Sequence, residues 1–340
     1  MDQKKKVRLA DIAEKLNISA VTVSKALSNK DGVGDDLRKQ IKDLAYEMGY
    51  QTKKDTTPGS DDTESGTGNI GILIPNKFFT MTNSYYWYLF NFISQELLNR
   101  KYYSIMELLT NEDEENLNLP HMLNDKKVDG VIILGQVSNA YLEAIHSHYD
   151  NFILLDFYTN SMYYDSVSDD NYYCSYMMTN YVISQGHKKL RFVGNIGATS
   201  SIQDRYMGFQ KAMIENKLSS DITEAINDRN EKGRDIELQL PLEDMPTAFI
   251  CNCDETAARL IKTLNEKGFK VPEDISVTGF DNYLTQNTID IGLTTVFIKP
   301  ENTAKVASDL ILNKINGRDY IKGRHLISGN LIIRDSVKKL

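Results

Sequence analysis

Hydrophobic positions near the start of the chain recur with the spacing of short amphipathic helices. Leu9, Ile12, Ala13 and Leu16 are three or four positions apart, which predicts one buried stripe on a first helix. A polar turn over residues 17–19 separates this helix from a second one, and a third amphipathic stretch follows. We therefore predict that three short helices enclose one small core within the first 50 residues.

The second predicted helix has the features of a DNA-reading element. Ser19 is placed to cap its N-terminus, while Val23 and Ala26 are expected to pack inward. In a helix-turn-helix motif the N-terminal part of the second helix meets base edges, and nearby hydroxyl and ammonium groups hold phosphates. The predicted DNA contacts are Ala20, Val21 and Lys25 on bases, Ser19, Thr22 and Ser24 on the backbone, and Leu9 and Ser28 beside them.

From residue 69 onward, short apolar runs alternate with longer amphipathic ones. The short runs predict strands at 70–74, 104–108, 130–134, 152–155, 190–193, 249–251 and 275–279. The longer ones predict helices at 87–99, 174–185, 205–216, 256–267 and 301–315. Such alternation predicts an α/β fold with parallel sheets and right-handed crossovers. Ligands bind beyond the carboxyl ends of the strands in such folds, so functional residues are expected just after each strand.

The first 50 residues also carry a family motif. Residues 7–50 closely resemble the DNA-binding headpiece of the lactose-repressor (LacI/GalR) family, whose pattern is T-x-x-D-x-A-x-x-x-x-V-S-x-x-T-V-S-R-x-L followed by a helix ending L-G-Y. Arg8, Ile18 and Lys25 stand where the family commonly has Thr, Val and Arg. Lys25 would offer the single charge of an ammonium group, whereas an Arg at this position would offer the bidentate fork of a guanidinium group. The resemblance implies a headpiece that reads an operator, and these substitutions leave the operator sequence open.

Four later segments resemble the effector domain of the same family: DNYYCSYMMTNYVISQGHKKLRFVG, SIQDRYMGFQKAM, PTAFICNCDETAARLI and VPEDISVTGFDN. The resemblance implies a type I periplasmic-binding-protein-like body, in which two Rossmann-like subdomains with parallel sheets close on a small ligand. It implies a headpiece at 1–50, a linker at 51–68 and an effector-binding and dimerisation domain at 69–340. The N-subdomain would take about 69–167 and 299–324, and the C-subdomain about 168–298 and 325–340.

The same resemblance indicates a ligand site. In the family the Arg of an R-x-x-G-F segment and the Asp of a G-F-D-N segment hold the ligand, typically a sugar or another small metabolite; here these are Arg205 and Asp281. A guanidinium offers a fork of donors, and a carboxylate accepts from adjacent hydroxyls. Cys253 replaces a usual Asn, so the identity of the effector is open. The other predicted ligand contacts are Asp254, Cys253, Asp156, Tyr86, Phe79 and Ser201.

Each of these contacts has a structural alternative. Arg205 could form a salt bridge at a helix start, and Asp281 could cap the next helix. Asp156 follows a predicted strand and could face solvent instead. The aromatic run at 85–88, with Phe78 and Phe79 before it, could stack on a sugar ring, fill the core or form a subunit interface.

The segment at 51–68 departs from the family pattern. It contains no Ile, Leu, Val or aromatic residue and is rich in Asp, Thr, Ser and Gly, which is typical of a linker. The family usually has here a hinge helix, Y-x-P-N-x-x-A-R-x-L, that drives a leucine into the minor groove. Because this segment has no leucine, we do not expect a wedge of that kind.

Charge is divided unevenly along the chain. Residues 1–50 contain ten Lys and Arg against eight Asp and Glu, a balance of +2, whereas the whole chain carries −8. The remainder therefore carries −10 and repels phosphate, so nucleic-acid contact is expected only at the N-terminal end. Because +2 is modest for a DNA binder, a homodimer on a pseudo-palindromic operator is expected.

The sequence argues against other classes of protein. The five histidines form no H-E-x-x-H or nucleophile–base arrangement, and G-x-S-x-G and G-x-x-x-x-G-K are absent. Gly66, Gly68 and Gly71 have the spacing G-x-G-x-x-G, but Gly66-Thr67-Gly68 lies before a predicted strand, which is the wrong side for a dinucleotide loop. Cys251-x-Cys253 has the wrong spacing for a metal site. We predict no catalytic residue, cofactor or metal. Lys4 to Lys6 precede no apolar core, so we expect a cytoplasmic protein without a membrane segment. The alternative is a cytoplasmic or exported solute-binding protein without a regulatory role, which would lack the helix-turn-helix.

Overall fold

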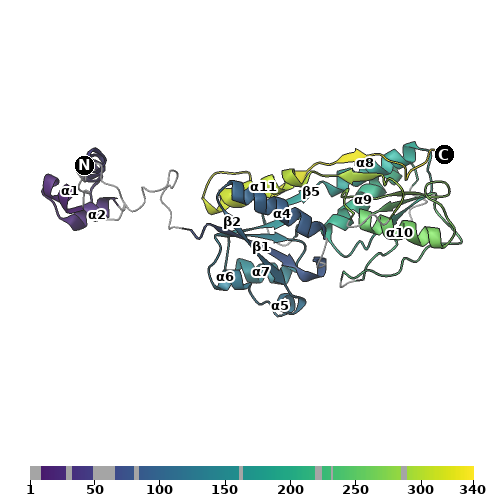
Figure 1. Ribbon diagram of the computed structural model, residues 1–340, viewed down its shortest axis with the longest axis horizontal. Coiled ribbons are helices and arrows are strands. Elements are labelled where there is room, and N and C mark those ends of the chain that lie inside the picture. Colours follow the sequence, from purple (N-terminus) through teal and green to yellow (C-terminus); the bar gives the residue numbers. More distant parts are fainter. Residues whose placement is uncertain are drawn as a thin grey trace, which may run out of the picture. The chain divides into compact units, whose positions relative to one another are not determined.

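A computed structural model describes residues 9–27, 33–48, 66–79, 84–160, 164–218, 224–230, 233–284 and 289–340. The chain forms two compact units, residues 1–65 and 66–340 (Figure 1). Ser28 and most of the predicted linker lie outside the described residues. The domain boundaries proposed from the sequence stay a prediction.

The N-terminal unit consists of three short helices, as predicted: α1 (Leu9–Leu16), α2 (Ala20–Leu27) and α3 (Asp35–Glu47). Ile12, Val23, Ala26 and Ile41 are fully buried at its centre. The turn between α1 and α2 places Asn17 at φ 52°, a left-handed conformation that asparagine tolerates better than most residues. These helices therefore enclose one core, on which α2 is fixed.

The larger unit begins with a six-stranded parallel sheet in the order β10-β5-β4-β3-β1-β2. Its strands are β1 (Asn69–Pro75), β2 (Tyr103–Leu109), β3 (Gly130–Leu134), β4 (Phe152–Leu155), β5 (Ser166–Asp169) and β10 (Arg324–Ile327). Helices α4 (Tyr85–Asn99) and α11 (Pro300–Ile315) cover one face, while α6 (His121–Asn124) and α7 (Asn139–His146) cover the other (Figure 1). The short η1 (Asn76–Phe78) follows β1, and α5 (Asn111–Glu115) follows β2. Apolar side chains thus fill both faces of this sheet.

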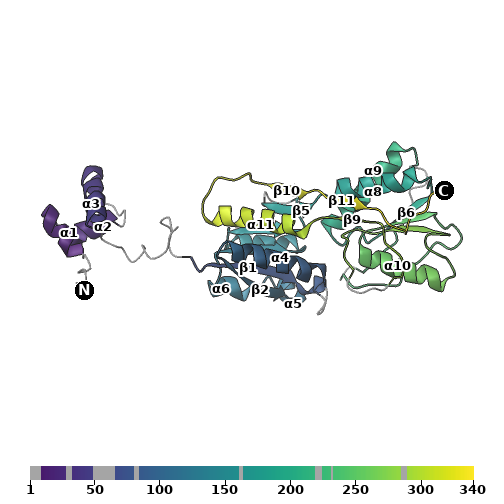
Figure 2. The same ribbon diagram turned by 45° about the horizontal axis from the view of Figure 1, so that its top comes forward.

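A second parallel sheet, β6-β7-β8, lies beside the first. Its strands are β6 (Leu190–Val193), β7 (Ala248–Cys251) and β8 (Ser276–Thr278). Helices α8 (Asn171–Ser184) and α9 (Ser200–Glu215) cover one face and α10 (Asp254–Glu266) covers the other (Figure 2). The two sheets and their helices form the two halves of a single body.

The chain passes between the two halves three times, after β5, between β9 (Thr295–Phe297) and α11, and between β10 and β11 (Asn330–Ile332). Strands β9 and β11 pair antiparallel at these crossings. Three crossings next to one another leave the halves free to tilt about this region while each stays packed.

All the predicted strands and helices of the body are present, with boundaries shifted by a few residues. Strands β5, β9, β10 and β11 and helices α5, α6 and α7 were not predicted, because each is only three to eight residues long. The sequence analysis was wrong about the position of Arg205 at a helix start. Helix α9 begins at Ser200 and is capped by the Thr199 hydroxyl, which accepts from the Ile202 N–H, so Arg205 lies one turn further in. No described helix is both long and apolar enough to cross a membrane.

Candidate functional site

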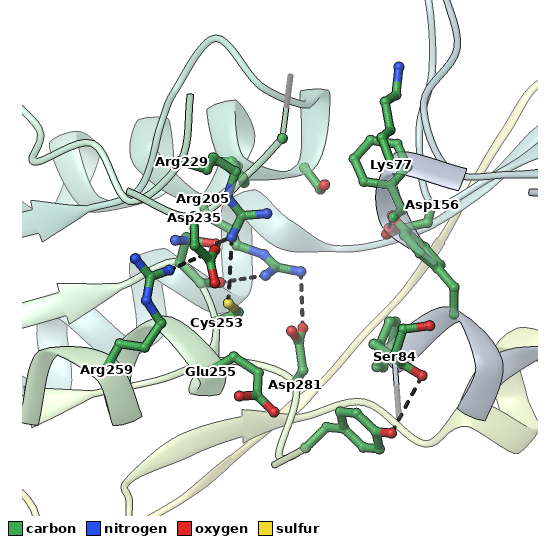
Figure 3. Close-up of a pocket in the computed structure, with 18 residues that line it drawn as sticks. Lys77, Ser84, Asp156, Arg205, Arg229, Asp235, Cys253, Glu255, Arg259 and Asp281 are labelled. Atoms are coloured by element: carbon green, nitrogen blue, oxygen red, sulfur yellow. Dashed lines mark hydrogen bonds and ion pairs between the residues drawn. The ribbon is translucent and has the colours of Figure 1, made fainter. Parts of the chain in front are cut away.

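A cavity of about 360 Å³ lies where the carboxyl ends of the two sheets face each other (Figure 3). From the first half it is lined by Lys77, Phe78, Ser84, Tyr85, Tyr86 and Asp156. From the second half it is lined by Ser201, Ile202, Arg205, Arg229, Gly233, Asp235, Asn252, Cys253, Glu255, Arg259, Asp281 and Tyr283. A molecule bound there would contact both halves at once.

Arg205 is held rigidly at the floor of this cavity. Its guanidinium donates to Asn171 Oδ1 at 2.7 Å, to the Asn252 carbonyl and to Asp281 Oδ1 at 3.1 Å. It also lies over the ring of Phe280, 3.8 Å from the centroid. Only 8% of the Arg205 side chain and 13% of the Asp281 side chain are exposed. The pair therefore presents fixed donors and acceptors to a ligand at little entropic cost.

Asp156 faces this pair from the opposite half (Figure 3). It follows β4 directly and adopts φ 66°, a left-handed conformation that turns the chain at the strand end. The Tyr86 hydroxyl donates to its Oδ2 at 2.7 Å. Burial raises the pKa of Asp156 to about 6, although the charge of Arg205 acts in the other direction. Ionisation of this carboxyl group is therefore costly where it lies.

Arg229 reaches the cavity from a buried ion pair. Its guanidinium donates to both carboxylate oxygens of Asp228, at 2.7 and 3.1 Å, and Asp228 is fully buried. Asn252 and Thr256 donate to the same carboxylate. Burial acts to raise the pKa of Asp228, but hydrogen bonds and the charge of Arg229 lower it to about 2. Asp228 therefore stays ionised and anchors Arg229.

The remaining cations of the wall are also paired. Arg259 lies 2.7 Å from Asp235 and donates to the carbonyls of Asp228 and Ile236. Lys77 lies 3.2 Å from Glu114.

Six of the eight predicted ligand contacts line the cavity: Arg205, Asp281, Cys253, Asp156, Tyr86 and Ser201. The structure places Asp254 elsewhere. Its side chain is buried under the cavity wall, where it accepts from the Thr295 hydroxyl at 2.6 Å and the Tyr283 N–H at 2.8 Å. Phe79 packs edge-on against Trp87, with ring centroids 6.0 Å apart, and does not line the cavity.

Several lining residues were not predicted. Asn252 and Glu255 lie on either side of the predicted Cys253 and Asp254 but do not belong to the family pattern from which those two residues were predicted. Arg229 and Asp235 lie in the irregular segment before β7, where no periodicity or motif marks them. The sequence left open whether the aromatic run at 85–88, with Phe78 and Phe79 before it, stacks on a ligand, fills the core or forms an interface. Of these residues, Tyr85 and Phe78 line the cavity, as does the predicted Tyr86.

Helix α2 presents the surface predicted for DNA. Ser19 caps it, since its hydroxyl accepts from the Thr22 N–H at 3.0 Å. Ala20 and Lys25 are exposed, and Val21 is 65% exposed although it is apolar. Leu9, in contrast, packs against the core of the helical unit. Contact between α2 and DNA stays a prediction.

Comparisons with known proteins match both units. Residues 8–53 match the family described as "Bacterial regulatory proteins, lacI family", and residues 179–337 match the "Periplasmic binding protein-like domain". A curated relative, the HTH-type transcriptional repressor PurR of Aliivibrio salmonicida (strain LFI1238), is 23% identical over 98% of this chain and 99% of its own. The fold resembles that of a CelR–cellobiose complex, with TM-score 0.67, 17% identity and coverage of 97% of this chain and 100% of that one. It equally resembles the lac repressor dimer bound to operator and the anti-inducer ONPF, with TM-score 0.67, 18% identity and coverage of 98% and 100%.

An exposed, capped second helix joined to a two-halved body with a central cavity defines a class of DNA-binding transcriptional regulators. Within that class, this chain carries a DNA-binding domain that matches the lacI family of bacterial regulatory proteins and, after it, a periplasmic binding protein-like domain. The PurR relative named above is a transcriptional repressor.

Proposed function

We propose that this protein is a sequence-specific repressor that binds a pseudo-palindromic operator as a homodimer and is controlled by a small polyhydroxylated effector, of the sugar class, in the cavity of its body. The observation that carries the proposal is the Arg205–Asp281 pair, which lines a cavity formed by both halves. A rigid fork beside a carboxylate is suited to adjacent hydroxyl groups.

The DNA-binding part rests on α2. Its exposed face combines the small Ala20, the apolar Val21 and the charged Lys25, which suits entry into a major groove. The acidic body leaves residues 1–50, with a charge balance of +2, as the part of the chain that suits DNA. Two copies of that unit would double the number of phosphate contacts.

The control part rests on contacts between the two halves. The Tyr158 hydroxyl, after β4, donates to Asp204 of α9 at 2.7 Å, and Arg324 of β10 donates to the same carboxylate at 2.8 Å. Nearby, the Ser200 N–H donates to Gln136 Oε1 at 2.7 Å. A ligand in the cavity favours one tilt of the halves over others, and this shift changes the spacing of the two headpieces in a dimer.

The test begins with selection of duplexes from a random pool by the full chain, followed by affinity measurement by fluorescence anisotropy. We expect enrichment of an inverted repeat. Lys25→Ala should weaken binding of that repeat by about tenfold or more, whereas Lys262→Ala, which removes an exposed lysine of α10, should not. The affinity for the repeat is then measured again with sugars such as cellobiose and ribose at saturating concentration, and an effector should change it. Failure to enrich any sequence would contradict operator binding.

A further inference from the structure

The cations of the cavity wall share one property. Each of them already has a carboxylate partner: Lys77 with Glu114 at 3.2 Å, Arg205 with Asp281 at 3.1 Å, Arg229 with Asp228 at 2.7 Å and Arg259 with Asp235 at 2.7 Å. An anionic ligand would add a negative charge beside these carboxylates, of which that of Asp228 is fully buried and those of Glu114 and Asp281 are only 11% and 13% exposed. The wall is therefore poorly suited to a phosphate or a carboxylate ligand.

Asp156 differs from Asp281 and Asp235, the wall carboxylates that form ion pairs with Arg205 and Arg259. Within the described part of the chain it forms no ion pair, and its hydrogen-bond partner is the neutral Tyr86 hydroxyl. Behind it, Asp169 is only 3% exposed. Asp156, Asp169 and Asp281 all interact with the single guanidinium of Arg205, which already forms an ion pair with Asp281. The region around Asp156 thus lacks positive charge.

The surfaces beside Asp156 also suit a cation. The rings of Phe78, Tyr85, Tyr86 and Tyr283 line the cavity. Aromatic faces attract ammonium groups within about 6 Å of the ring centroid, and the attraction grows when water is excluded. Aromatic rings and a carboxylate together make a recognised arrangement for binding an ammonium group.

We infer that the effector is a polyhydroxylated molecule carrying a protonated amine, of the amino-sugar class, with its ammonium group on Asp156 and its hydroxyls on Arg205 and Asp281. This inference rests on the proposed function and specifies the ligand of the same cavity. A neutral sugar would cover Asp156 without supplying the missing charge, so that a buried carboxylate would stay unpaired.

The test uses the full chain and calorimetric titration with matched hexose sets: glucose, galactose and mannose, each as the neutral sugar, the 2-amino sugar and the uronic acid. We expect one amino sugar to bind at least about tenfold more tightly than its neutral and acidic counterparts. Asp156→Asn should abolish this preference, and Asp156→Glu should retain part of it. Asp150→Asn, which removes an exposed carboxylate of the same half, should leave the preference unchanged.

The pH dependence provides a second readout. The titratable and charged groups that face Asp156 are Tyr85 and Tyr86 of α4, Asp169 of β5, Arg205 of α9 and Asp281 after β8. The preference for the amino sugar should fall as the pH is lowered through about 6, where Asp156 takes up a proton.

Two results would overturn the inference: tighter binding of a neutral sugar or uronic acid, or a preference that survives in Asp156→Asn. Absence of binding by every amino sugar of the sets would overturn it as well. The DNA selection experiment decides the proposed function separately, because it needs no ligand.

Discussion

Single residues fix the geometry of both functional surfaces. Ser19 starts α2 through one hydrogen bond to the Thr22 N–H, and its hydroxyl also lies 2.8 Å from that of Thr22. Arg205 holds the cavity floor through three partners from different elements. These residues could be found from the sequence, because a cap and an R-x-x-G-F segment are local patterns. Asp228 could not be found in this way. It pairs with the adjacent Arg229, but Asn252 and Thr256, which also donate to it, are distant in sequence and reach it only after folding.

Removal of the Ser19 hydroxyl tests how much this single cap stabilises α2. Ser19→Ala should destabilise the start of α2 by about 1 kcal/mol, since the Thr22 N–H loses its acceptor. Hydrogen exchange of the α2 amides in the DNA-free full chain measures this as about a fivefold loss of protection. Ser19→Thr keeps the acceptor and serves as the control. Equal protection in Ser19→Ala and the unaltered chain would show that the cap has no energetic role.

Packing between elements explains choices that local propensity does not. Gly208 lies in the middle of α9, where glycine normally costs about 1 kcal/mol relative to alanine. A Cβ atom at this position would lie 2.1 Å from the Tyr172 carbonyl oxygen of α8. The glycine thus allows the close approach of α8 and α9. Prediction from sequence located these helices but could not detect their close contact, because the pattern of one helix does not contain the position of the other.

Gly208→Ala tests this packing at the element scale. It should lower the free energy of unfolding by about 1 to 3 kcal/mol, since α8 and α9 must move apart, even though alanine favours a helix. Urea unfolding monitored by far-UV circular dichroism measures the change. Gly197→Ala is the matched control, because its Cβ atom would meet its closest neighbour at 3.5 Å, an ordinary contact. Stability of Gly208→Ala at or above that of the unaltered chain would contradict the close approach.

Over the whole molecule, the buried carboxyl groups of the cavity region link stability to pH. Burial raises the pKa values of Asp156, Asp169 and Asp281, so the folded protein holds these protons more tightly than the unfolded chain. Such groups stabilise the fold below the unfolded pKa, and this stabilisation is lost as the pH rises through the folded pKa. Asp228 acts in the opposite sense, because its pKa is lowered to about 2 and its contribution is lost only in acid.

We therefore expect the ligand-free protein to lose stability as the pH rises from about 4 to about 6.5, by about 2 kcal/mol for Asp156 alone. Urea unfolding at several pH values measures this slope. Asp156→Asn should flatten it, whereas Asp150→Asn should not. A slope that is identical in the unaltered chain and in Asp156→Asn would contradict the assignment of a raised pKa to Asp156.

The fold class and the two-unit arrangement could be read from the sequence, because alternating strands and helices and a helix-turn-helix are periodic patterns. Only some of the residues that line the cavity could be predicted. Arg205 and Asp281 lie in motifs, whereas Arg229 and Asp235 come from a segment without regular structure. Asp254 was wrongly expected in the cavity, because its carboxylate binds the Thr295 hydroxyl instead of facing the ligand space.

The pairing of β10 with β5 joins residues 324–327 to residues 166–169, far apart in the sequence. The second half is also closed late, since Ser336 bonds the Val277 carbonyl and the Leu340 N–H bonds the Gln185 carbonyl. On a ribosome the three-helix unit can fold as soon as it emerges, but neither half of the body is complete until almost the entire chain has been made. Until α11 and β10 have been made, the nascent body leaves one apolar face of the first sheet partly uncovered and the outer edge of β5 unpaired, which makes its biogenesis a natural point of chaperone dependence.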